Sequence, residues 1–152
     1  MLVEIKELRK TFDNGTKALQ GVNLSVNEGE FVVILGASGS GKTTLLRSIN
    51  GLVDYEHGEI KFCNKIISPS TLPALRKQTG MVFQDFNLVN NLSSFNNVLT
   101  GLLDSSNTLM SMFYLFTKEQ KKQGLSCLEM VGLLDKAYSR VDKLSGGQQQ
   151  RV

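Results

Sequence analysis

The clearest chemical signal in this chain is the segment Gly36-Ala37-Ser38-Gly39-Ser40-Gly41-Lys42-Thr43-Thr44, which fits the pattern G-x-x-x-x-G-K-[ST]. Glycines let such a loop turn so that successive backbone N–H groups face one point, and the helix that follows adds the positive end of its dipole. We expect the Lys42 ammonium to reach the β- and γ-phosphates, and the Thr43 hydroxyl to ligate Mg²⁺. The segment therefore predicts a binding site for a nucleoside triphosphate.

Apolar residues on both sides predict the elements that hold this loop. The run at 31–35 predicts a buried strand that enters the loop, and residues 42–50 have the spacing of a helix that Gly51 ends. The alternative is a glycine-rich turn between strand and helix that binds no ligand. Other patterns predict strands at 2–8, 19–26 and 58–62, a short helix at 71–78 and a short strand at 81–83.

Beyond Gln84 the apolar residues recur every three or four positions, which is typical of helices. This spacing predicts one helix around residues 95–102. A second helix is expected to begin near Thr117, because Gln120 three positions later completes a capping-box pattern. We therefore expect a mixed α/β part at 1–84 and a helical part at 85–152.

A second glycine motif, Leu144-Ser145-Gly146-Gly147-Gln148, has the residue types of another phosphate contact. Ser145 can cap a helix, and the two glycines let backbone N–H groups approach an anion closely. Taken alone, the motif fits the plain N-cap of a surface helix equally well.

The order of these motifs resembles the ATP-binding-cassette (ABC) ATPases over all 152 residues. The order is a phosphate loop, a lone glutamine after a short strand, a helical stretch and then L-S-G-G-Q. The resemblance implies an α/β fold of the P-loop NTPase type, with an N-terminal antiparallel β-subdomain and a helical subdomain, incomplete at the C-terminus. It also implies that residues 36–44 bind ATP, that Gln84 reaches Mg²⁺ and the attacking water, and that the signature residues contact nucleotide: Ser145, Gly146, Gly147 and Gln148.

The resemblance assigns individual roles as well. Phe12 stands where such ATPases place an aromatic ring that stacks on adenine, and simple packing at a strand end is the alternative. Lys42 and Gln84 become the candidate catalytic residues, and Thr43 and Gln84 the candidate metal ligands. The implied cofactors are ATP and Mg²⁺.

In this family the signature of one subunit closes over the nucleotide held by another. The resemblance therefore implies a second ATPase subunit in a head-to-tail dimer, membrane permease subunits, and an indirect link to a solute-binding protein. It implies no nucleic-acid partner and a place at the cytoplasmic face of the cell membrane. Closure on ATP binding, and opening after hydrolysis, would bias a transport path between two states.

Further segments resemble the ATPases of phosphonate importers: Phe86-Asn87-Leu88-Val89, the insert at 110–122 and the glutamines at 148–150. Importers of polar amino acids or of methionine share part of this pattern and stay open as alternatives. The resemblance favours import of phosphonate or a related oxyanion. The apolar segment 109–116 predicts either core of the helical part or a docking site for a permease.

Composition adds a few limits. A net charge of +3, from 17 basic and 14 acidic residues, is too small to argue for nucleic acid or a membrane surface. Cys63 and Cys127 fit neither a metal pattern nor a disulfide framework, which favours a reducing compartment. No window approaches the roughly 18 to 20 apolar residues of a membrane span.

Nothing after Arg151 matches the Walker B aspartate, the catalytic glutamate or the switch histidine of the family. We therefore expect an N-terminal piece of a longer subunit, with ATP hydrolysis at no more than background rates. The alternatives are a soluble ABC-type ATPase acting on DNA or ribosomes, a P-loop kinase or GTP-binding protein, and a nucleotide-binding module without turnover. Only about 60 residues separate Gln84 from Leu144, and they show no sustained heptads, which counts against an ABC-type ATPase acting on DNA. The motif L-S-G-G-Q counts against a kinase or GTP-binding protein.

Overall fold

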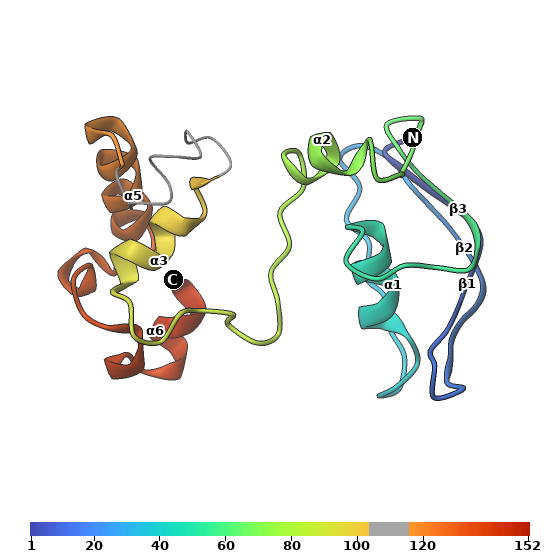
Figure 1. Ribbon diagram of the computed structural model, residues 1–152, viewed down its shortest axis with the longest axis horizontal. Coiled ribbons are helices and arrows are strands. Elements are labelled where there is room, and N and C mark those ends of the chain that lie inside the picture. Colours follow the sequence, from blue (N-terminus) through green and yellow to red (C-terminus); the bar gives the residue numbers. More distant parts are fainter. Residues whose placement is uncertain (104–115) are drawn as a thin grey trace. The chain divides into compact units, whose positions relative to one another are not determined.

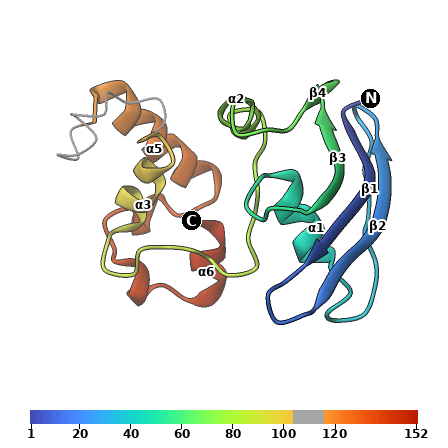
Figure 2. The same cartoon turned by 45° about the vertical axis from the view of Figure 1, so that its right-hand side comes forward.

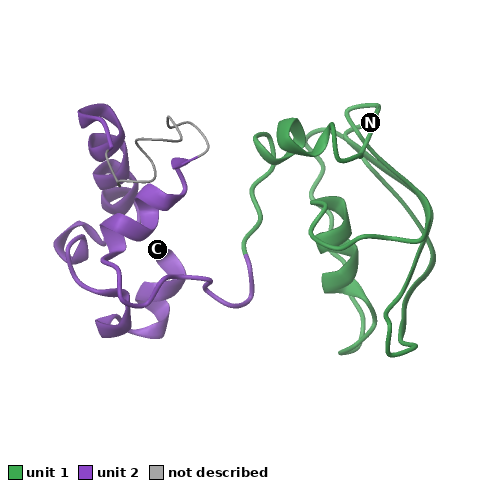
Figure 3. Ribbon diagram, in the orientation of Figure 1, with its two compact units in different colours: residues 1–82 green, residues 83–152 purple. Residues whose placement is uncertain are grey.

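The computed structural model describes residues 1–103 and 116–152. The chain divides into two compact units, Met1–Val82 and Phe83–Val152 (Figure 3). The predicted division falls after Gln84, whereas the division by contacts falls after Val82, so Gln84 belongs to the second unit.

The first unit contains a four-stranded antiparallel sheet (Figure 1). Its strands lie in the order β2-β1-β3-β4, which makes β1 a central strand, and their bounds are β1 Val3–Thr11, β2 Lys17–Val26, β3 His57–Phe62 and β4 Lys65–Ile66. Ile5 lies opposite Leu24 on one side and Ile60 on the other. The predicted strands at 2–8, 19–26 and 58–62 are therefore present, and each is slightly longer than predicted.

A bulge in β1 decides which residues enter the core. Ile5 and Leu8 are both buried, although a strand with strict alternation would turn residues three apart to opposite faces. The register shifts between them, and Glu7 has a φ of 47°. The Asn23 side chain holds the bulge, since its Oδ1 accepts from the Glu7 N–H at 3.0 Å and its Nδ2 donates to Glu7 Oε1 at 2.7 Å.

Two helices belong to the same unit. The helix α1, Lys42–Ile49, lies beside the sheet (Figure 2). Its Leu45 is buried in the cluster that contains Ile5, Leu8 and Ile60. The helix α2, Leu72–Arg76, adds Leu75 to this cluster and has a proline in its first turn. Burying these apolar side chains is the main stabilising term for the unit.

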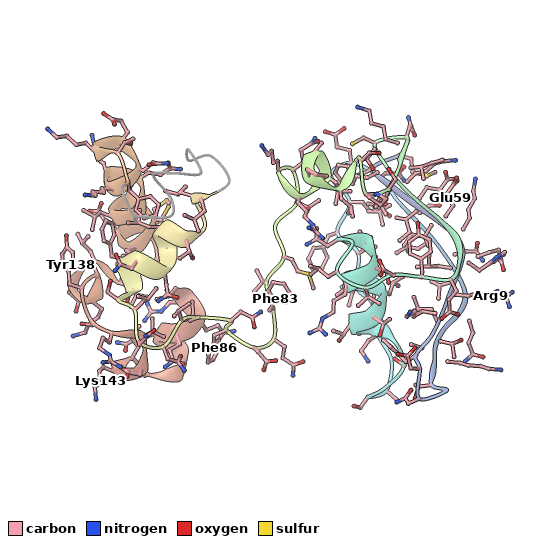
Figure 4. The ribbon with its side chains drawn as sticks, viewed as in Figure 1. Arg9, Glu59, Phe83, Phe86, Tyr138 and Lys143 are labelled. Atoms are coloured by element: carbon pink, nitrogen blue, oxygen red, sulfur yellow. The ribbon has the colours of Figure 1, made fainter. Side chains whose placement is uncertain are left out.

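The prediction of strands at 31–35 and 81–83 is wrong. Neither segment forms a strand, and Phe31, Leu35 and Val82 are 90%, 86% and 92% exposed. A buried strand needs neighbours on both edges and cover on both faces, and within residues 1–103 and 116–152 no strand pairs with either segment. Phe83 and Phe86 lie on the extended segment between α2 and the next helix (Figure 4).

The second unit is helical. It contains α3 Ser94–Thr100, α5 Lys118–Met130, α6 Gly146–Arg151 and the 3₁₀ turns η2 Leu134–Lys136 and η3 Val141–Lys143. Its core gathers buried apolar residues from α3, α5 and the turns: Phe95, Leu99, Phe116, Leu128, Leu133 and Ala137. Gly124 lets α5 approach α3 closely, because an added Cβ would lie 3.2 Å from Leu99 and from Phe95.

The predicted cap of α5 is confirmed. Thr117 Oγ1 accepts from the Gln120 N–H at 3.2 Å, and Gln120 Oε1 accepts from the Thr117 N–H at 2.9 Å. The segment 109–116, with its two possible roles, lies outside the described residues except for Phe116, which is buried in the core. In the parts that are described, no helix has both the length and the apolar character to cross a bilayer.

Candidate nucleotide-binding site

The phosphate loop leads directly into α1, as its sequence predicts. Gly41 is the N-cap with a φ of 85°, and the Leu45 N–H donates to the Gly41 carbonyl at 2.8 Å. No side chain caps this helix end. Since the first N–H groups of a helix have no partner within the helix, the start of α1 presents donors that an anion can satisfy.

Glycine is required at Gly41 by its surroundings as well as by its backbone conformation. A Cβ at this position would collide with the carbonyl oxygen of Ala18, which lies in β2. Gly39 also has a positive φ, of 78°, but an added Cβ there would meet open space. The loop is thus seated against β2 through Gly41 and is open at Gly39.

The Lys42 side chain folds back over the loop. Its Nζ donates to the carbonyl oxygens of Gly36 and Ala37, at 2.8 and 2.6 Å, and to Ser40 Oγ at 3.2 Å. The ammonium therefore lies within the loop, next to the uncapped N-terminus of α1. This combination of a cation, helix N–H groups and glycines fits a polyphosphate.

The remaining residues of the loop are accessible. Thr43 is exposed in the first turn of α1 and Thr44 is half-buried, whereas Ala37, Ser38 and Ser40 are exposed. In residues 1–103 and 116–152, no group of three or more His, Cys, Asp or Glu is placed to hold a metal ion. The hydroxyl of Thr43 fits Mg²⁺ only together with oxygens from outside the protein, which is how Mg²⁺ is held in sites where phosphates complete its coordination.

The far end of α1 is held by hydrogen bonds from residues that no sequence motif identifies. Arg76, at the end of α2, donates from Nε to the Asn50 carbonyl at 3.3 Å and from Nη2 to the Gly51 carbonyl at 2.9 Å. Thr79 Oγ1 donates to Asn50 Oδ1 at 3.1 Å. These bonds fix the helix on which the phosphate loop is mounted. No local pattern could have identified Arg76, because its acceptors lie 25 and 26 residues away.

Phe12 lies at the hairpin between β1 and β2. Its N–H donates to the Thr16 carbonyl at 2.9 Å, and the residue is 39% exposed. Lys10 Nζ lies 5.5 Å from the ring centroid, a cation–π distance. The ring therefore has exposed surface, and it is on the hairpin whose β2 strand contacts Gly41 through Ala18.

The other predicted site residues belong to the second unit. Gln84 is exposed on the segment before α3. Ser145 caps α6, where its Oγ accepts from the Gln148 N–H at 3.4 Å and Gln148 Oε1 accepts from the Ser145 N–H at 2.9 Å. Both polar side chains are thus used inside the cap, whereas Gly146 and Gly147 face open space. The groups left for an external phosphate are backbone groups.

Comparison with known proteins identifies the family. The ABC transporter family profile matches residues 19–152. The chain belongs to this family. The resemblance inferred from the motif order is therefore confirmed, and so is the ABC ATPase fold with its antiparallel β-subdomain.

Among curated relatives, the chain is 48% identical over 154 aligned positions to the phosphonates import ATP-binding protein PhnC of Lactobacillus acidophilus. It is 49% identical to phosphonates import ATP-binding protein PhnC 3 of Nostoc sp.. These alignments cover 99% and 100% of this chain but 60% and 58% of the relatives, so the ABC family chain described here spans about three-fifths of their length.

Solved ABC structures agree in fold. A dimeric post-hydrolysis state of an ATP-binding cassette bound to ADP and Pi aligns with a TM-score of 0.83 and 37% identity. That alignment covers 99% of this chain and 66% of the other. An ATP-binding cassette of an ABC transporter in its ADP conformation aligns with a TM-score of 0.76 and 28% identity, over 99% and 61% of the two chains.

Proposed function

We propose that this ABC family protein binds ATP with Mg²⁺ at residues 36–44. In the whole subunit, ATP hydrolysis energises import across a membrane, of phosphonate or a related oxyanion, whereas residues 1–152 alone hydrolyse ATP at no more than background rates. The observation that carries the proposal is the phosphate loop, with Gly41 seated on β2, α1 uncapped and Lys42 Nζ inside the loop. The names of the relatives, at 46% to 49% identity, support the cargo class.

In this proposal each site residue has a separate role in binding or hydrolysis. The N–H groups at the start of α1 and the Lys42 ammonium bind the β- and γ-phosphates, whose oxygens replace the carbonyl acceptors that Lys42 now uses. Thr43 and Gln84 would be the protein ligands of Mg²⁺, which would neutralise charge on the phosphate oxygens when bound. Gln84 orients the attacking water, and the exposed face of Phe12 stacks on adenine.

The remaining parts of the proposal concern assembly. Residues 145–148 of one subunit contact the nucleotide of a second ATPase subunit in a head-to-tail dimer, and the dimeric cassette among the solved relatives supports this arrangement. Permease subunits couple the dimer to transport at the cytoplasmic face of the membrane, and a solute-binding protein delivers the cargo to them. No nucleic acid takes part.

Titration of the protein with Mg·ATP by calorimetry tests the binding step. Lys42→Ala should weaken binding by about tenfold to a hundredfold, because hydrogen bonds to a charged group contribute about 1.5 to 3 kcal/mol and 1.4 kcal/mol corresponds to tenfold. Lys122→Ala, which removes an exposed lysine of α5, should leave the affinity unchanged. Equal affinity for the wild type and Lys42→Ala would refute a phosphate site at this loop.

The cargo is tested in the assembled transporter. With the whole ATPase subunit, permease and solute-binding protein present, ATP turnover should rise on addition of a phosphonate and should not rise with methionine or a polar amino acid. Stimulation by methionine alone would overturn the oxyanion assignment and leave the nucleotide site intact.

A further inference from the structure

A buried amide in the second unit, Asn97, makes three hydrogen bonds to backbone. The side chain belongs to a residue of α3 that is 7% exposed. Its Oδ1 accepts from the Val89 N–H at 2.8 Å, and its Nδ2 donates to the Val89 carbonyl at 3.1 Å and to the Ser93 carbonyl at 3.0 Å. Asn97 thus pairs with both backbone groups of Val89, as a residue of a neighbouring strand would.

The segment that follows Val89 lies beside the segment that leads to the signature. The Asp142 N–H donates to the Asn90 carbonyl at 3.2 Å, and the Val141 N–H to the Leu92 carbonyl at 3.0 Å. Ser93 and Arg140 form an antiparallel bridge, and the Ser94 N–H donates to the Ser139 carbonyl at 3.0 Å. We call these paired segments, residues 90–94 and 139–142, the ribbon.

The ribbon is fastened to the helix that carries the signature. Gln149, on α6, donates from Nε2 to the Val141 carbonyl at 2.9 Å and to the Leu144 carbonyl at 3.2 Å. Leu144 is buried and its N–H donates to the Val141 carbonyl at 3.0 Å. A continuous path of hydrogen bonds therefore runs from Asn97, through Val89 and the ribbon, to α6, and it does not pass through α5.

We propose that Asn97 is a positioning residue that ties the segment following Gln84, through the ribbon, to the loop that carries residues 144–148. Gln84 lies five residues before Val89 in the chain. A displacement of this segment would therefore be transmitted to the signature by backbone hydrogen bonds and not only by side-chain packing in the core. This hydrogen-bonded connection from Asn97 to α6 lies within the second unit, and its role in transport rests on the proposed function.

Amide hydrogen exchange, followed by NMR in the 152-residue chain, measures this tie. In Asn97→Ala the amides of Val89, Val141 and Asp142 should exchange about tenfold to a hundredfold faster. The Val89 N–H loses its acceptor directly, whereas the Val141 and Asp142 N–H groups keep their acceptors, Leu92 and Asn90, which belong to the segment that Asn97 no longer holds. Protected amides in the middle of α5, such as that of Leu128, should change less than twofold. Asn96→Ala, one residue along the same helix, is the matched control and should leave all these amides unchanged.

A reciprocal variant keeps the proposal testable if Asn97→Ala fails to fold. Gln149→Glu keeps the shape of the side chain and removes its two donations at the other end of the path. The Val89 amide should then exchange faster, since coupling between two sites acts in both directions.

The proposal is overturned if the α5 amides and the ribbon amides speed up equally in Asn97→Ala, because Asn97 would then only stabilise the unit as a whole. It is also overturned if Gln149→Glu leaves Val89 unchanged. The exchange experiment uses no nucleotide. The proposed role of Asn97 can therefore be refuted without affecting the proposed ATP site, and the ATP site can be refuted without affecting the role of Asn97.

Discussion

At the scale of single residues, the phosphate loop depends most directly on Gly41. Its backbone is left-handed, and the Ala18 carbonyl occupies the place where a side chain would begin. The motif explains the glycine at position 41 by the turn of the phosphate loop. The structure shows a second reason, since the nearby β2 strand leaves no room for a side chain there. The bulge at Glu7 could not be predicted from the sequence, because it depends on hydrogen bonds with Asn23 of the neighbouring strand.

Gly41→Ala and Gly39→Ala form a matched pair. Both place a Cβ on a left-handed backbone, which costs about 1 to 2 kcal/mol, and only Gly41→Ala adds a collision with the Ala18 carbonyl. We expect Gly39→Ala to lower the free energy of unfolding by about 1 kcal/mol, and Gly41→Ala by about 2 kcal/mol or more. Urea denaturation measures both. Equal losses would show that the contact with β2 does not constrain the loop.

The bulge makes a prediction about pH. Hydrogen bonds from Asn23 and then Arg9 lower the pKa of Glu7 below its ordinary value. A carboxyl whose folded pKa lies below its unfolded pKa adds stability above the unfolded pKa, and this stability is lost as pH falls through the folded pKa. Asn23→Ala should raise the folded pKa of Glu7 toward its unfolded value, so the stability lost on acidification should be smaller and the loss should end at a higher pH.

An NMR titration of the side-chain carboxyls measures this shift. Asn14→Ala is the control, since Asn14 bonds to Thr16 in the hairpin turn and should leave the Glu7 titration unchanged. An unchanged pKa of Glu7 in Asn23→Ala would contradict the assignment of Asn23 as its main partner.

At the scale of elements, local sequence patterns predicted the helices whose ends are set by neighbouring residues. The helix at 42–49 follows from its spacing and from Gly51, and α5 follows from the capping box at Thr117 and Gln120. The strand predicted at 31–35 is absent because a buried strand depends on partners that a local pattern does not specify. The two-residue strand β4 was missed because it is too short to show a period.

The bonds from Arg76 to the end of α1 predict an effect on this helix. Arg76→Ala should lower the free energy of unfolding by about 0.5 to 1.5 kcal/mol, the usual contribution of a hydrogen bond. The amides near Asn50 and Gly51 should lose protection first, because their carbonyls are the acceptors that hold α2. Urea denaturation and hydrogen exchange measure the two effects.

Lys122→Ala removes one positive charge elsewhere and is the control for net charge. If both variants lose the same stability, the effect of Arg76 is one of charge, and the proposed fastening of α1 is wrong.

At the scale of the whole molecule, each unit has its own apolar cluster. Leu8 is fully buried in the first and Leu128 in the second. The fold class was predictable from motif order, because the phosphate loop and the signature occur at a separation typical of one family. The division near residue 84 was visible as a change in apolar period, whereas its placement after Val82 depends on contacts between distant residues.

Leu128→Ala should destabilise the second unit by about 2 to 5 kcal/mol, the cost of a cavity in a well-packed core. Because the clusters are separate, amides of the sheet should keep their protection while those of α3 and α5 lose it. Leu8→Ala should give the opposite pattern. Loss of protection in both units after either substitution would show that they unfold as one cooperative body.

The three acceptors around Lys42 Nζ have a consequence for substitution at this position. An ammonium nitrogen points its three N–H bonds along a tripod, and Gly36 O, Ala37 O and Ser40 Oγ supply one acceptor for each. A guanidinium is flat and directs its donors in a fork, so arginine at position 42 would conserve the charge but not the directions of donation. We therefore expect the loop to accommodate the ammonium of lysine better than the guanidinium of arginine, although the two carry the same charge.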